Sequence, residues 1–129
     1  MSRFQSKTPL GRVRGLGSSH HGGQHWLYER FTSVALLLLS AWLIFSLLAL
    51  PDFSRETVVE WLKAPLAAVP MMLFVITAFL HGLDGLKVVL DDYVHDDGNR
   101  VAFSFILTLL AFGGAAFALF ALAQIVFGA

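Results

Sequence analysis

Three long stretches of the chain contain no Asp, Glu, Lys or Arg. They cover residues 31–50, 64–83 and 101–129. An α-helix rises about 1.5 Å per residue, so each stretch is long enough to cross the hydrocarbon core of a bilayer, which is about 30 Å thick. The pattern predicts an all-α membrane protein with three transmembrane helices, over about residues 31–50, 65–90 and 101–126.

Polar segments separate these stretches. In residues 51–63, Val58, Val59 and Trp61 indicate a partly amphipathic turn of helix on the membrane surface. Residues 91–100 form a second, acidic loop. Residues 1–28 carry no acidic residue and have five glycines between Gly11 and Gly23, which favours an irregular arm over a regular helix. We therefore expect an N-terminal arm over residues 1–28 and a three-helix membrane anchor over residues 29–129.

Composition narrows the classes of function. The chain is 57% hydrophobic and 14% charged, which is typical of a membrane protein, and its zero formal net charge gives no reason to expect a nucleic-acid partner. It contains no cysteine, so disulfides, thiolate-bound iron–sulfur clusters and cysteine zinc sites are excluded. Any metal or cofactor would have to be held by His, Asp, Glu, Met or Tyr.

Basic residues predict the orientation in the membrane. On the N-terminal side the sequence carries Arg3, Lys7, Arg12, Arg14, Arg30, Lys87 and Arg100, against Arg55 and Lys63 on the other side. The positive-inside rule then places the N-terminal arm in the cytoplasm of a bacterium, whose inner membrane the chain would span several times. A mitochondrial inner membrane, with the arm in the matrix, is the alternative, but Pro9 and the glycines disfavour the amphipathic helix of a transit peptide.

His81 is an ionisable residue within the second apolar stretch. Such a residue is costly at membrane depth, so it is interpreted first as functional. Ala78 and Gly85 share its helical face and Gly82 lies beside it, which would let a flat macrocycle approach the backbone. Imidazole is a common axial ligand of haem iron, so haem b is a candidate, with its second ligand from another chain. The alternative is that His81 only hydrogen-bonds a neighbouring helix and the small residues serve helix packing.

Polar residues crowd the end of the same helix. Tyr93 could hydrogen-bond a quinone carbonyl at the membrane edge, with Asp92 relaying protons; alternatively, Tyr93 is an interfacial aromatic residue and Asp92 a solvated charge. Asp84 and Lys87 are expected to neutralise each other near the inner interface; the alternative is that Asp84 orients His81 or passes protons.

Arg30 lies at the inner end of the first span, shortly after His25 and Trp26. A guanidinium there could hold a carboxylate such as a haem propionate, or a lipid phosphate. Small residues on the spans, including Gly113 and Gly114, predict close helix neighbours, and we expect another subunit to cover much of the surface.

The stretch from His81 to Tyr93 reads His-Gly-Leu-Asp-Gly-Leu-Lys-Val-Val-Leu-Asp-Asp-Tyr. It resembles the signature of the D-type hydrophobic membrane-anchor subunit of succinate dehydrogenase, respiratory complex II: a His, a Gly four residues on, and an Asp-Tyr pair eleven and twelve residues on. These are His81, Gly85, Asp92 and Tyr93. The stretch from Arg14 through His25-Trp26 to Arg30 is similar to the family's entry into its first helix.

The resemblance implies a subunit that is not catalytic alone and contributes no catalytic residue. Its partners would be a flavoprotein that oxidises succinate, an iron–sulfur subunit and a second, C-type anchor. Haem b would be shared between the anchors, with His81 as one axial ligand and with Arg30 and His25 at the propionates. Tyr93, with Asp92 close by, would bind ubiquinone.

Two alternatives stay open. One is an anchor of a quinol:fumarate reductase, which runs the reaction in the other direction. The other is a small structural membrane protein that binds neither haem nor quinone.

Overall fold

The computed structural model describes residues 22–128, which form four α-helices. These are α2 (Gly22–Leu48), α3 (Arg55–Lys63), α4 (Pro65–Tyr93) and α5 (Asp97–Phe127). By length and composition, α2, α4 and α5 can each cross a membrane, whereas α3 is only nine residues long. The expected all-α membrane fold with three spans is confirmed.

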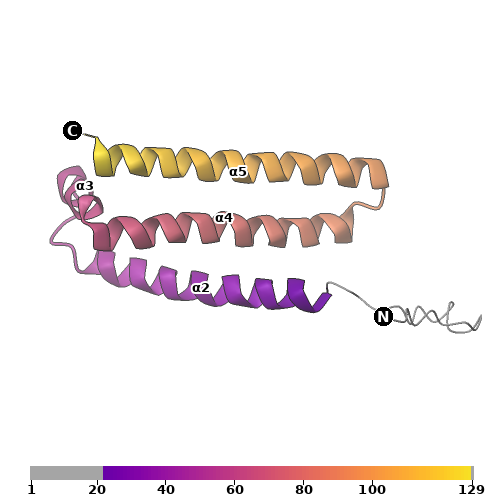
Figure 1. Cartoon of the computed structure of the whole chain (residues 1–129), viewed down its shortest axis with the longest axis horizontal. Coiled ribbons are helices and arrows are strands. Elements are labelled where there is room, and N and C mark those ends of the chain that lie inside the picture. Colours follow the sequence, from indigo (N-terminus) through magenta and orange to yellow (C-terminus); the bar gives the residue numbers. More distant parts are fainter. Residues whose placement is uncertain (1–21, 129) are drawn as a thin grey trace, which may run out of the picture.

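The three long helices lie side by side in one layer, with α4 in the middle (Figure 1). α4 packs against both α2 and α5, whereas α2 and α5 make no contact with each other over the described residues. A single layer leaves both faces of α4 open. The side chains buried among residues 23–128 are therefore few: Leu62, Ala67, Ala68, Leu83 and Leu122, and one polar residue, Thr32.

α2 begins earlier than the sequence predicted. Residues 22–28 are helical, so the expectation of an irregular arm extending to residue 28 is wrong for this part. Two interactions along the helix stabilise the extra turns: His25 lies 3.6 Å from Glu29, and the guanidinium of Arg30 lies 5.5 Å from the ring centre of Trp26. The rest of the predicted arm, residues 1–21, lies outside the described residues.

α3 confirms the expected surface helix between the first two spans. Ser54 caps its first turn by accepting a hydrogen bond from the amide of Thr57. Leu62 is buried, and the ring of Trp61 stacks on that of Trp42 in α2, with centroids 5.9 Å apart. The stacked rings connect α3 to the C-terminal half of α2.

The opposite end of the layer holds the connection between α4 and α5. Asp96 caps α5 by accepting a hydrogen bond of 2.8 Å from the amide of Asn99. Arg100 pairs with Asp97 in its own helix and lies 3.9 Å from Asp91 of α4. These charged side chains connect the end of α4 to the start of α5, at the end of the layer where α2 begins.

Candidate functional site

His81 lies at the interface of α4 with α2. Its Nδ1 atom is 3.1 Å from the hydroxyl oxygen of Thr32, and that hydroxyl also lies 3.1 Å from the backbone carbonyl oxygen of Glu29. Thr32 is only 6% exposed. The expected ionisable side chain at membrane depth is thus held by one side chain of the neighbouring helix.

The second ring nitrogen of His81, Nε2, has no hydrogen-bond partner within residues 22–128. In the same part of the chain, no buried side-chain nitrogen or oxygen lacks a partner. Nε2 must therefore be accessible from outside the chain. A half-buried imidazole with one nitrogen bonded and the other accessible suits a metal or a hydrogen-bond partner supplied from elsewhere.

Small residues keep the surface beside His81 open. A Cβ atom added to Gly82 or Gly85 would meet no atom within 4 Å. Next to Gly82 runs an apolar groove between α4 and α5, lined by Ala78, Phe79, Gly82, Leu83, Leu86, Leu107, Leu110 and Ala111. His81 itself does not line this groove, so the groove shows only that the α4 backbone is open at Gly82, the residue next to the histidine.

Tyr93 and Asp92 lie at the C-terminal end of α4, well away from His81. α4 is helical from Pro65 through Tyr93, so twelve residues separate His81 from Tyr93 by roughly 18 Å along the axis. Tyr93 is 79% exposed and Asp92 is also exposed. The structure leaves both side chains open at the end of the helix and does not bring them to the histidine.

The two predicted residues on α2, His25 and Arg30, lie on different sides of the helix. At about 100° per residue, His25 and Glu29 begin on the same side of the helix as Thr32, whereas Arg30 begins on nearly the opposite side. His25 is therefore aligned with the residue that holds His81, and Arg30 lies with Trp26.

Asp84 and Lys87 depart from expectation. They form no ion pair with each other among the residues that the structure describes, so the predicted neutralising pair is wrong. Thr32 is the residue that the sequence interpretation missed. The available signal was a hydroxyl in α2 at a depth similar to that of His81 in the adjacent helix.

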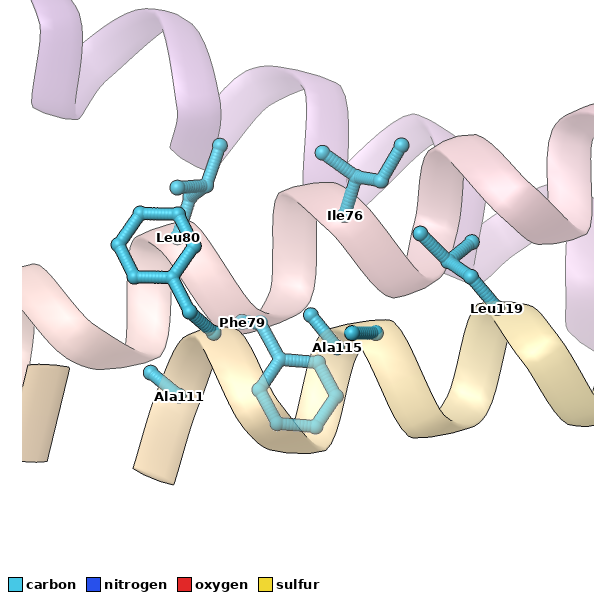
Figure 2. A pocket seen from close by; sticks show the side chains of 8 residues that line it. Ile76, Phe79, Leu80, Ala111, Ala115 and Leu119 are labelled. Atoms are coloured by element: carbon cyan, nitrogen blue, oxygen red, sulfur yellow. The ribbon is translucent and has the colours of Figure 1, made fainter. Parts of the chain in front are cut away.

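A further pocket lies between α4 and α5 (Figure 2). Its volume is about 280 Å³, and its lining is apolar: Ile76, Phe79, Leu80, Ala111, Phe112, Ala115, Ala116 and Leu119. It offers no ionisable side chain. The candidate site therefore consists of His81, with its accessible second nitrogen, and the polar C-terminal end of α4.

Comparison with known proteins assigns this arrangement to a family. The family model described as succinate dehydrogenase/fumarate reductase transmembrane subunit matches residues 5–122. The succinate dehydrogenase hydrophobic membrane anchor subunit of Paracoccus denitrificans is 32% identical over 124 residues, which are 95% of this chain and 94% of that protein. The protein of the same description from Rickettsia bellii (strain RML369-C) is 31% identical over 115 residues, 84% of this chain and 92% of that one. The chain therefore belongs to the family of succinate dehydrogenase hydrophobic membrane anchor subunits.

Proposed function

We propose that the chain anchors a succinate:ubiquinone oxidoreductase in a bacterial inner membrane and shares haem b and the ubiquinone site with a second anchor subunit. Family membership and the three apolar helices support the anchoring role. Succinate oxidation belongs to a flavoprotein subunit, and an iron–sulfur subunit delivers the electrons. The chain is not catalytic alone.

The observation that carries the haem assignment is the state of the two nitrogens of His81. Nδ1 has a partner in Thr32, whereas Nε2 has none within residues 22–128 and is accessible; on the same helix, a Cβ added to Gly82 or Gly85 would meet only open space. A neutral imidazole with its Nδ1 hydrogen-bonded is the form that binds iron through Nε2. The residues present therefore fit a haem, which when bound would carry single electrons.

The second axial ligand has to come from the other anchor. Among the described residues, the other histidines are His25 and His95, which are exposed and lie near helix ends rather than at membrane depth. His25, on the Thr32 side of α2, and Arg30, whose long side chain would have to reach round from the other side, would bind the haem propionates. A protonated imidazole and a guanidinium both donate charge-assisted hydrogen bonds to carboxylates.

Tyr93 and Asp92 would serve the quinone. The phenol of Tyr93 stays neutral near pH 7 and can donate a hydrogen bond to a quinone carbonyl. Asp92 is exposed at the same helix end and could take protons from the aqueous phase for quinone reduction. Arg30, Lys87 and Arg100 gather at this end of the layer, which supports its placement at the cytoplasmic surface.

The relatives favour succinate oxidation over fumarate reduction as the reaction of the complex. The family description covers both enzymes, but the matched relatives from Rickettsia and Paracoccus are described as succinate dehydrogenase subunits. A haem-free structural role would be met by the contact with Thr32 alone, and the accessible second nitrogen in the membrane favours a further partner for His81.

The test is the haem content of the complex purified in mild detergent. We expect a b-type optical spectrum in the wild type, lost in His81→Ala and kept in His95→Ala, a control in the exposed loop. Co-purification of all subunits and succinate oxidation with a soluble dye would show that the variants assemble. A wild-type spectrum in an assembled His81→Ala complex would overturn the proposal.

A further inference from the structure

We infer that Thr32 is a positioning residue for His81: its hydroxyl holds the ring so that Nδ1 carries the proton and Nε2 faces outward as the ligand nitrogen. The inference rests on the proposed haem ligation and adds a residue on another helix that controls it.

The hydroxyl of Thr32 has one proton, and the partner to which it donates that proton determines whether Nδ1 of His81 is protonated. The Thr32 oxygen lies 3.1 Å from the Glu29 carbonyl oxygen and 3.1 Å from His81 Nδ1. A carbonyl oxygen can only accept, and that of Glu29 accepts from the Ser33 hydroxyl at 2.7 Å as well, so the Thr32 hydroxyl donates to it as the second of two side-chain donors. Nδ1 must then carry a proton and donate to the Thr32 oxygen. The opposite arrangement, with the hydroxyl donating to Nδ1, would set two unprotonated oxygens against each other.

The environment makes this chain of hydrogen bonds effective. Thr32 is the one polar side chain buried among residues 23–128, and it lies in a helix that crosses the membrane. Water is scarce there, so no solvent molecule replaces a lost partner, and an unpaired N–H in such surroundings is costly. The bond from Thr32 to its own helix also restricts rotation of the hydroxyl, which keeps the acceptor aimed at the ring.

The same bond affects the electronic character of the ligand. An acceptor at Nδ1–H increases the electron density at Nε2 and makes it a stronger donor to a metal. A stronger donor stabilises the ferric state more than the ferrous state. Loss of the Thr32 hydroxyl should therefore shift the midpoint potential of the haem to more positive values and weaken haem retention, on the order of tenfold.

Thr32→Val is the test variant because valine keeps the shape of threonine and removes the hydroxyl. Thr32→Ser keeps the hydroxyl. Thr108→Val is the matched control, because Thr108 in α5 also donates to a carbonyl of its own helix, that of Ser104, and does not contact His81. Each variant would be studied in the assembled complex by redox titration and by the electron paramagnetic resonance signal of low-spin ferric haem.

We expect a positive shift of the midpoint potential and a broadened low-spin signal in Thr32→Val, with both properties close to wild type in Thr32→Ser and Thr108→Val. Equal potentials and signals in Thr32→Val, Thr108→Val and the wild type would overturn the role of Thr32. So would a Thr32→Ser complex that behaves like Thr32→Val, since shape rather than the hydroxyl would then be responsible. Either result, together with haem loss in His81→Ala, would leave the proposed function standing, whereas haem retention in His81→Ala would remove both.

Discussion

The ring of Phe79 in α4 fills the space that a side chain at Gly114 in α5 would need. A Cβ atom at Gly114 would lie 2.7 Å from Cε1 and 3.0 Å from Cζ of Phe79. Neighbouring Gly113 is different, because a Cβ there would meet nothing within 4 Å. The close approach of α4 and α5 therefore depends on one glycine of the pair.

Gly114→Ala should destabilise the packing of α4 on α5. The ring of Phe79 would have to move, and overpacking of this kind typically costs about 1–3 kcal/mol. Gly113→Ala should not destabilise the packing and should raise stability by about 0.5–1 kcal/mol, because its Cβ points into open space and alanine is the better helix former. Thermal unfolding of the detergent-solubilised complex would measure both effects. Equal melting temperatures for the two variants would contradict the close contact between Gly114 and Phe79.

Tyr93→Phe should weaken quinone reduction and spare succinate oxidation by a soluble dye. The change removes one hydrogen bond, which is typically about 1 kcal/mol, or roughly fivefold in the KM for quinone. Tyr28→Phe is the natural control, since Tyr28 is an exposed tyrosine near the same end of the layer, on α2. Equal loss of both activities, or an equal effect of Tyr28→Phe, would argue against a quinone role for Tyr93.

Arg30→Gln should shift the haem midpoint potential to more negative values. Removing a cation near the propionates favours the ferric state, and loss of a charge-assisted hydrogen bond should weaken haem binding by roughly tenfold. This shift is opposite in sign to that expected for Thr32→Val. Arg55→Gln, at the other end of the layer, should leave the redox titration unchanged; an identical curve for Arg30→Gln would remove Arg30 from the propionate site.

Asp52 should keep its charge in acid well below the usual range of a carboxyl group. Hydrogen bonds from the Ser54 and Thr57 hydroxyls and from the Ser54 amide lower its pKa from 3.8 to about 2. The pKa of Asp52 is lower in the folded chain than in the unfolded chain. Its ionised carboxylate, hydrogen-bonded to Ser54 and Thr57, therefore stabilises the start of α3 fully above about pH 4. This contribution is lost as the pH falls through about 2.

A carboxyl-carbon NMR titration of the chain in detergent micelles would measure the pKa of Asp52. In a Ser54→Ala, Thr57→Ala double variant the midpoint should return toward 3.8, because the two hydroxyl donors are gone. A midpoint near 3.8 in the unmodified chain would contradict the hydrogen bonds from Ser54 and Thr57 to Asp52.

Much of the fold could be predicted from the absence of charge alone. A stretch such as residues 101–129 has few structures available other than a membrane helix, because its backbone must bond internally in lipid. The early start of α2 was missed because glycine frequency argued against a helix. The stabilising pairs, His25 with Glu29 and Arg30 with Trp26, depend on side-chain geometry.

The candidate site was predictable only in part. His81 was identified because an ionisable imidazole is costly in an apolar helix, whereas for Tyr93 and Asp92 the residues left two interpretations open and the resemblance to a family signature favoured the quinone role. The contact between Thr32 and His81 depends on the relative depth and rotation of α2 and α4. Neither quantity is encoded by a local pattern in one helix.

The most direct test of the central claim is the distance between Nε2 of His81 and iron in an experimental structure of the assembled complex. The account predicts that Nε2 coordinates a haem shared with the second anchor, while Nδ1 remains hydrogen-bonded to Thr32. An imidazole that faces lipid or bonds only to protein, with no porphyrin beside it, would contradict the account.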